Sequence, residues 1–269
     1  MIARTRIADY AFVELIGSGG HGSVHLATRP DRLPVSAPQV AVKVLSGNTS
    51  PAAFDRAADE LRLWASMRSP HLAQVYDTGR EDGTFYYAMT YYPLGSLGRS
   101  SEALTRNEVH RAVAHAARAA HDLHEVGSVH RDIKPNNVLL HEAGAHLSDL
   151  GLAQILTPGQ TVTGLGAIGA VEFLDPLIVK GGPAGRPSDI FALAATWHRA
   201  LTGIGIYPDM VDDNPILALR SVIETDPVVD ARLPDAEAAI IEACLHPDPS
   251  SRPATAADLA AQIEELITS

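Results

Sequence analysis

The chain has only one cysteine, Cys244, among its 269 residues. An internal disulfide and a metal site built from several cysteines are therefore both excluded. No apolar run reaches the ~18 residues that a membrane-spanning helix requires, and residues 1–6 carry charge without the apolar segment of a signal peptide. We therefore expect a soluble, cytoplasmic chain with no membrane insertion up to Ser269, and we leave open whether the native chain continues beyond it.

Positive charge is also scarce. The chain has 32 acidic and 21 basic residues, a net charge of −11 and a pI near 5.5. Binding to nucleic acid depends on the neutralisation of phosphates by lysine and arginine, so a nucleic-acid partner has no electrostatic support. Solubility is a sufficient reason for the excess of acid, and steering of basic substrates is the alternative.

Lysine is the scarcest charged residue. The basic residues comprise 18 arginines and three lysines, which are Lys43, Lys134 and Lys180. Either cation serves on an exposed surface, but a compact ammonium on a flexible stem is needed at some functional positions. The few lysines are therefore candidates for such positions.

Residues 130–151 carry the main chemical pattern of the chain. The segment reads His130-Arg-Asp-Ile-Lys-Pro-Asn-Asn137 and is followed by Ser-Asp149-Leu-Gly. It resembles the H-R-D-x-x-x-x-N loop and the D-F-G turn of eukaryotic-like Ser/Thr protein kinases, here of bacterial type. The alternative interpretation is an ordinary polar turn between a helix and a buried strand.

Two upstream motifs agree with this resemblance. Residues 17–24, Gly-Ser-Gly-Gly-His-Gly-Ser-Val, match the kinase pattern G-x-G-x-x-G-x-V. A hairpin turn or a Rossmann loop could also supply such glycines, but a Rossmann loop opens a helix, whereas here a strand-like Val-His-Leu-Ala follows. Ala41-Val-Lys43 resembles the strand that bears the phosphate-binding lysine.

The resemblance implies roles for the polar residues. Asp132 would accept the hydroxyl proton, and Lys134 would balance charge on the transferring phosphoryl group. Asn137 and Asp149 would bind Mg²⁺ through oxygen atoms. Lys43 would contact the phosphates of ATP and pair with Glu60.

The partner of Lys43 has alternatives. Glu60 is chosen because it lies ten residues before Pro70, the spacing that kinases show. Asp55 and Asp59 are the other candidates, each with the simpler role of an exposed helix residue.

The implied ATP site combines the glycine-rich turn, the Lys43–Glu60 pair, apolar residues around the adenine ring and two backbone groups that follow Met89. Its expected members are Ile16, Gly17, Ser18, Gly19, Gly20, His21, Gly22, Val24, Ala41, Lys43, Glu60, Thr90, Tyr92 and Leu139. The apolar members are equally compatible with ordinary core positions, and His21 with an exposed turn.

The order of elements predicts an α+β, bilobal protein-kinase fold over residues 1–269, with a β-rich lobe at 10–92 and a mostly helical lobe at 93–267. Strands are expected at 10–17, 23–28, 40–45, 75–76 and 85–91, with a turn at 79–83. A helix over 51–68 begins after Ser50, and a capping box of Thr105 and Glu108 opens a helix that ends near Gly127. Further helices are expected at 188–201, 216–223, 236–244 and from 255.

The chain departs from the family pattern in the segment that follows the catalytic residues. Ala170 stands in place of a hydroxyl residue, and Leu177 replaces the glutamate that pairs with a buried arginine, here Arg252. An unpaired buried guanidinium is costly. We therefore predict that Arg252 pairs with another acid, with Asp175 and Glu172 as candidates, or else is exposed.

Three further residues or groups follow from the resemblance. Asp189 is expected to hold the backbone of the catalytic loop, and Thr157, Thr161 and Thr163 are candidate phosphorylation sites. Trp64 and Leu150 are expected to touch in a stack of side chains with Val75 and His130. The alternative is that Trp64 covers the outer face of its helix.

The sequence therefore predicts an ATP- and Mg²⁺-dependent Ser/Thr protein kinase that acts on protein substrates, with autophosphorylation. A pseudokinase scaffold that binds nucleotide and a small-molecule phosphotransferase are the alternatives. The intact Lys43, Asp132, Asn137 and Asp149 argue against the first. The glycine-rich turn and Lys134 argue against the second.

Overall fold

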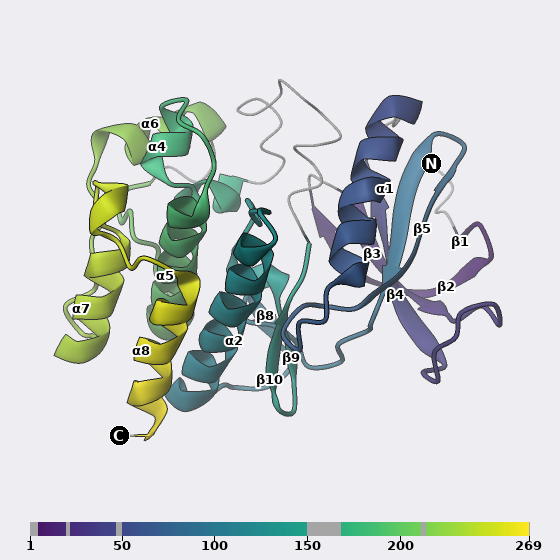
Figure 1. Cartoon of the computed structure of the whole chain (residues 1–269), viewed down its shortest axis with the longest axis horizontal. Coiled ribbons are helices and arrows are strands. Elements are labelled where there is room, and N and C mark those ends of the chain that lie inside the picture. Colours follow the sequence, from purple (N-terminus) through teal and green to yellow (C-terminus); the bar gives the residue numbers. More distant parts are fainter. Residues whose placement is uncertain (1–4, 20–21, 47–49, 150–167, 211–213, 269) are drawn as a thin grey trace. The chain divides into compact units, whose positions relative to one another are not determined.

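A computed structural model describes residues 5–19, 22–46, 50–149, 168–210 and 214–268 (Figure 1). The chain divides into two compact units. The first, which is rich in strands, contains the described residues up to Arg68 together with Ala73–Tyr92. The second, which is mainly helical, contains Ser69–Leu72 and the described residues from Pro93 onward. The predicted α+β class is confirmed.

A six-stranded sheet forms the first unit, in the order β1-β2-β3-β4-β6-β5. Its strands are β1 (Arg6–Ile7), β2 (Tyr10–Gly19), β3 (Gly22–Thr28), β4 (Gln39–Leu45), β5 (Val75–Glu81) and β6 (Thr84–Met89). All the pairings are antiparallel, and Lys43 of β4 lies opposite Val24 on one side and Tyr87 on the other. The chain reverses at Asp82 and Gly83, within the expected turn at 79–83, but β5 continues to Glu81 and therefore runs past the expected end at Tyr76.

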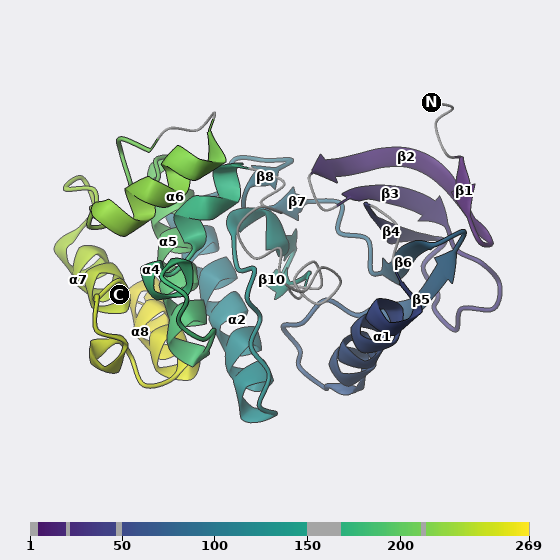
Figure 2. The ribbon, with the colours of Figure 1, turned by 90° about the horizontal axis from the view of Figure 1, so that it is seen from above.

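Helix α1 (Pro51–Ser66) packs against this sheet, where it contacts β5 (Figure 2). Ser50 caps it as predicted, because its hydroxyl accepts the Ala53 amide at 3.2 Å. The helix ends two residues before the expected position. Trp64 is 2% exposed, so the alternative that it covers an outer face is wrong.

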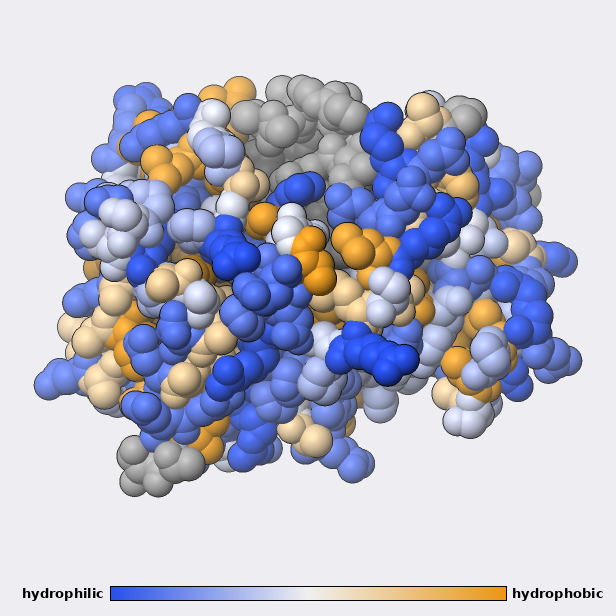
Figure 3. Space-filling model, viewed as in Figure 1, coloured by the Kyte–Doolittle hydropathy of each residue, from blue (hydrophilic) through white to orange (hydrophobic). Residues whose placement is uncertain are grey.

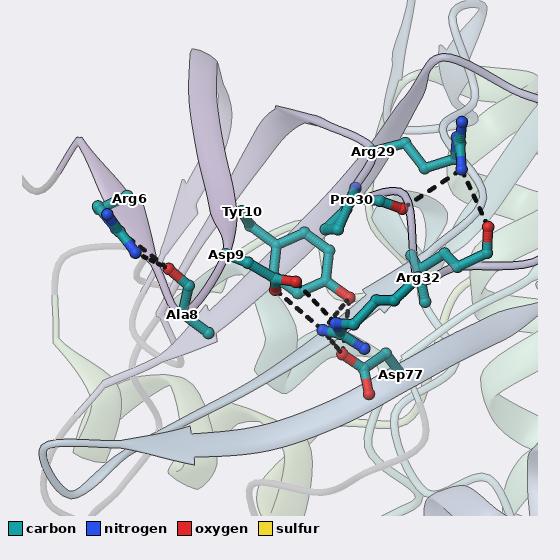
Figure 4. Close-up of polar contacts among 9 residues, drawn as sticks. Arg6, Ala8, Asp9, Tyr10, Arg29, Pro30, Arg32 and Asp77 are labelled. Carbon is teal, nitrogen blue, oxygen red and sulfur yellow. Dashed lines mark hydrogen bonds and ion pairs between the residues drawn. The ribbon is translucent and has the colours of Figure 1, made fainter.

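An ion-pair network ties the loop after β3 to two strands of the sheet (Figure 4). The guanidinium of Arg32 contacts the Asp9 carboxylate at 2.7 Å and the Asp77 carboxylate at 2.6 Å. Tyr10 donates its hydroxyl to Asp77 at 2.7 Å, and Arg32 lies over the Tyr10 ring. This long connection between β3 and β4 is therefore anchored to β2 and β5.

Three long helices form the centre of the second unit, where α2 (Arg106–Glu125) contacts both α5 (Arg186–Thr202) and α8 (Ala256–Thr268) (Figure 1). The remaining α-helices in the described ranges are α4 (Pro176–Val179), α6 (Pro215–Glu224) and α7 (Asp235–Cys244). The predicted capping box is present, with Glu108 accepting the Thr105 amide at 2.7 Å. Gly203 ends α5 with a φ of +74°, which glycine adopts without steric cost.

A small second sheet lies in the same unit, in the order β10-β9-β7-β8. Its strands are β7 (Gly95–Ser96), β8 (Arg99–Ser100), β9 (Val138–His141) and β10 (Gly144–Leu147). They are too short to give a periodic pattern, so the sequence did not predict them. Strand β9 follows Asn137 directly, and β7 contacts the short 3₁₀ helix Pro135–Asn137 that precedes β9.

The face in Figure 3 is largely hydrophilic, with apolar residues scattered over it. Ile216 is 76% exposed and Leu177 is 37% exposed. Among the helices of the described ranges, none combines the length and the hydropathy that a bilayer crossing needs.

Candidate active site

The catalytic segment brings three predicted side chains together between α2 and β9. The ammonium of Lys134 lies 2.8 and 2.9 Å from the two carboxylate oxygens of Asp132. Asn137 donates its amide to the Asp132 carbonyl at 2.6 Å and to one carboxylate oxygen at 3.0 Å. The side chains of Asp132 and Lys134 are 27% and 17% exposed, so the carboxylate is fixed in position but remains accessible. Such a group can accept a proton from a bound hydroxyl.

The backbone of this loop is held by Asp189 from the first turn of α5. Its carboxylate accepts the amides of His130 at 2.8 Å and Arg131 at 3.0 Å. Arg131 has a φ of +68°, a conformation that is costly for a residue other than glycine. The two bonds stabilise that conformation, and the prediction for Asp189 is confirmed. His124, which the sequence analysis missed, contacts the same carboxylate at 2.8 Å.

His130 links the loop to the end of β10. Its Nε2 lies 3.0 Å from the Ser148 carbonyl, and its Nδ1 accepts the Asp132 amide at 3.3 Å. The proton must therefore be on Nε2, because a carbonyl can only accept. The side chain is fully buried, and this burial lowers the pKa of His130, which keeps the ring neutral as the two bonds require.

The two predicted metal ligands lie on connected segments. The Ser148 amide donates a hydrogen bond to the Asn137 carbonyl at 2.8 Å. Asp149 is the residue after Ser148, so this bond connects the backbone segments that carry the two predicted ligands. Because the Nδ2 of Asn137 is used by Asp132, its Oδ1 is the atom that could bind a cation.

These two oxygen donors suit a Mg²⁺ ion that also binds a nucleotide. They are too few for a metal ion that only protein side chains hold. Within the described ranges, no group of three or more histidine, cysteine or acidic residues could hold a metal ion. Mg²⁺ is commonly bound by one or two carboxylates, water and substrate phosphates, so a site with few protein ligands suits a metal that enters with a nucleotide.

The glycine-rich turn occupies the ends of β2 and β3. Gly17 lies opposite Val24, Ser18 opposite Ser23, and Gly19 opposite Gly22. Gly22 has a φ of +138°, and a Cβ there would lie 2.1 Å from the Val44 carbonyl oxygen, so only glycine fits. A Cβ at Gly19 would meet nothing within 4 Å. Gly20 and His21 lie outside the described residues.

The predicted lysine–glutamate pair comes from two elements of the first unit. Lys43 is on β4 and Glu60 is on α1, and their ion pair stays a prediction. Asp59 instead pairs with Arg62 at 2.5 Å, and its side chain is 73% exposed. Asp55 is also exposed. Both alternatives therefore have the features of surface residues.

The apolar residues expected around adenine lie on separate strands. Ala41 is 2% exposed between Leu26 and Met89, while Ile16 and Val24 are half-buried. Leu139 is on β9 of the second unit and is also half-buried. Their common contact with a nucleotide stays a prediction.

The residues after Met89 are fixed by contacts that the sequence analysis missed. The Thr90 amide donates to the Gln74 carbonyl at 3.0 Å, and the Thr90 hydroxyl lies 2.8 Å from that of Tyr76. Gln74 and Tyr76 are close to Thr90 only because β5 pairs with β6. No spacing rule connects them.

The segment that departs from the family pattern contains the predicted buried ion pair. Arg252 contacts the Asp175 carboxylate at 2.5 Å, and the two side chains are 1% and 2% exposed. The prediction of an acid other than position 177 is therefore confirmed, and Glu172 instead faces Arg199 at 3.7 Å. Ala170 is in a short 3₁₀ helix, Ile168–Phe173. Leu150, Thr157, Thr161 and Thr163 lie outside the described residues, so their predictions stay open.

Comparison with known proteins agrees with this geometry. The profile of the family described as "Protein kinase domain" matches residues 10–263. Serine/threonine-protein kinase PknK of Mycobacterium tuberculosis is 33% identical over 270 residues, which cover 96% of this chain and 24% of that protein. Serine/threonine-protein kinase PknB of Mycolicibacterium smegmatis is 30% identical over 271 residues, which cover 94% of this chain and 42% of that protein. The chain thus spans less than half the length of these curated relatives.

Proposed function

We propose that this chain, which belongs to the protein kinase family, transfers the γ-phosphoryl group of ATP to serine and threonine hydroxyls of proteins. The observation that carries the proposal is the Asp132 carboxylate, which Lys134 and Asn137 hold in an accessible position. Two of the relatives that this chain resembles, PknK and PknB, are by name serine/threonine-protein kinases, which supports the same acceptor class.

In this proposal Asp132 receives the proton of the acceptor hydroxyl and orients its oxygen for attack. Lys134 lies against the same carboxylate, so its charge is available to a phosphoryl group that approaches the acceptor. Little covalent chemistry is required of a kinase, because positioning and charge stabilisation provide most of the acceleration. The bonds from Asp189 to the loop backbone serve that positioning.

Asn137 and Asp149 are the residues that would hold Mg²⁺, and Lys43 with the glycine-rich turn would hold the phosphates of ATP. Bound Mg²⁺ would neutralise charge on the phosphate oxygens. We also propose a cytoplasmic location, protein substrates and autophosphorylation within the segment that contains Thr157, Thr161 and Thr163.

The test is transfer of radiolabelled phosphate from ATP with Mg²⁺ to a generic protein substrate, followed by identification of the phosphorylated amino acids. Asp132→Asn should reduce transfer by at least about 100-fold, because the amide cannot accept the proton. It should leave ATP affinity nearly unchanged. Asp149→Asn should instead weaken ATP binding across a magnesium titration, because it removes a charged metal ligand.

The alternatives give different results. Transfer at the wild-type rate by Asp132→Asn would overturn the proposed mechanism. Nucleotide binding without transfer to any protein would indicate a pseudokinase. Transfer restricted to small-molecule hydroxyls would indicate a small-molecule phosphotransferase.

A further inference from the structure

Three hydroxyl groups gather at the end of the first unit, just before the chain enters the second at Pro93. The hydroxyls of Tyr76 and Thr90 lie 2.8 Å apart, although these residues are 14 positions apart in the sequence. The phenol of Tyr92 forms hydrogen bonds with the Thr90 side chain and with the Gln74 backbone. Thr90 is therefore the centre of a continuous chain of hydroxyls.

The directions of these bonds are mutually consistent. A threonine hydroxyl donates one hydrogen bond and accepts up to two. Tyr76 can therefore donate to Thr90 while Thr90 donates to Tyr92. A tyrosine phenol is neutral at neutral pH, and burial raises the pKa of Tyr92 further, so the group fits a chain of uncharged hydroxyls.

The backbone between Met89 and Pro93 is attached to β5 through the same residues. The Thr90 amide donates to the Gln74 carbonyl at 3.0 Å, and Gln74 immediately precedes β5. With the amide and the hydroxyl of Thr90 both engaged, its carbonyl is the group that the proposed function assigns to adenine.

We propose that the hydroxyl chain of Tyr76, Thr90 and Tyr92 positions the backbone that reads the purine and thereby increases the selection of ATP over GTP. Adenine presents an amino donor where guanine presents a carbonyl acceptor, so a fixed carbonyl on the protein favours adenine and disfavours guanine. A carbonyl that is free to move discriminates less well. This inference rests on the proposed function in its assignment of the Thr90 carbonyl and Tyr92 amide to the purine edge.

The test measures the equilibrium dissociation constants of ATP and GTP, with Mg²⁺, for the whole chain and its variants. Thr90→Val removes the central hydroxyl and keeps the branched shape. It should weaken ATP binding by roughly 3- to 10-fold, the range that corresponds to the loss of one ordinary hydrogen bond. GTP affinity should change less, so the ATP/GTP ratio should fall.

Two variants serve as controls. Thr78→Val is the same substitution on β5, where the hydroxyl makes only a long 3.4 Å bond to the Tyr86 carbonyl, and it should leave both affinities unchanged. Thr90→Ser retains the hydroxyl and should retain most of the ATP/GTP ratio. Tyr76→Phe should lower the ratio, and adding it to Thr90→Val should have little further effect, because one broken link already interrupts the chain.

An unchanged ATP/GTP ratio in Thr90→Val would overturn the proposal. This includes the case in which ATP and GTP affinity fall equally, because a purely structural defect acts on both nucleotides alike. Binding is measured instead of turnover, so that the proposed selection of ATP over GTP and the proposed kinase activity can be tested separately. Selective ATP binding without phosphoryl transfer overturns only the proposed function, whereas a wild-type chain that binds neither nucleotide overturns both.

Discussion

Replacement of Asp175 by alanine should destabilise the helical unit more than removal of any exposed acid. The carboxylate of Asp175 and the guanidinium of Arg252 are 2% and 1% exposed, so both charges are removed from water and depend on each other. Removal of one member of such a pair leaves the other charge buried without its partner. The characteristic loss is about 3–5 kcal/mol of unfolding free energy.

Two features of the site adjust this magnitude in opposite directions. Asp175 also accepts the Leu177 amide at 3.0 Å at the start of α4, so the substitution removes a helix cap worth about 1 kcal/mol. Arg252 would keep bonds to the carbonyls of His246 and Pro187, each at 2.9 Å, and would still lie over the Phe191 ring. These contacts limit the loss, and we therefore expect about 3–5 kcal/mol overall.

The assay is urea unfolding followed by circular dichroism, with Asp59→Ala as the matched control. Asp59 also pairs with an arginine, but the side chains of this pair are 73% and 68% exposed. Its removal should cost less than about 1 kcal/mol. If Asp175→Ala lost no more stability than Asp59→Ala, the argument from burial would be refuted.

A double variant separates charge from shape. Asp175→Ala combined with Leu177→Glu moves the acid from position 175 to position 177. The segment then has alanine and glutamate at the two positions where kinases that resemble this chain have them. The double variant should recover part of the lost stability, because a carboxylate is again available to Arg252. Leu177→Glu alone should not stabilise the chain, since Arg252 already has a partner.

Further predictions concern acid sensitivity and the glycine-rich turn. Burial lowers the pKa of His115 and of His146 to about 4, against an ordinary 6.5, so the unfolded chain binds more protons between these values. The free energy of unfolding should therefore fall as the pH drops from about 6.5 toward 4, by about 2 kcal/mol after allowance for partial exposure of both rings. The check is the urea midpoint of the wild type and of His115→Gln, measured across this pH range. Gly22→Ala should lower the melting temperature and the ATP affinity, because its Cβ would lie 2.1 Å from a carbonyl oxygen at a φ of +138°. Gly19→Ala has open space and should melt like wild type, and equal melting of both variants would contradict the steric argument.

Helix starts could be predicted from the sequence because capping involves neighbouring residues. Ser50 caps α1, and Thr105 with Glu108 forms the box that opens α2. Each bond closes over three positions, so residue types and spacing are sufficient. The ends of helices and strands were less accurate.

The expected turn at 79–83 shows why those ends were missed. Gly79 suggested a turn, but it is paired with Tyr86 within the sheet. A Cβ at Gly79 would lie 2.3 Å from the Tyr86 hydroxyl, so this glycine makes room for a ring on the neighbouring strand. A glycine required by a cross-strand neighbour looks the same in the sequence as a glycine required by a turn.

The sequence by itself determined the chemical groups of the catalytic segment. Asp132, Lys134 and Asn137 lie within six consecutive residues, so a few backbone dihedrals are enough to bring them together. The sequence also indicated that Arg252, if buried, needs an acid other than position 177, and Asp175 and Glu172 were the nearest candidates along the chain.

Only the tertiary structure decided which distant groups complete these sites. It selected Asp175 over Glu172 for Arg252, across 77 positions, and it brought Asp189 to the catalytic loop across 59. It also brought Tyr76 to Thr90 through the pairing of β5 with β6. Local chemistry specifies which bond a residue needs, whereas the packing of helices and the register of strands determine which partner is within reach.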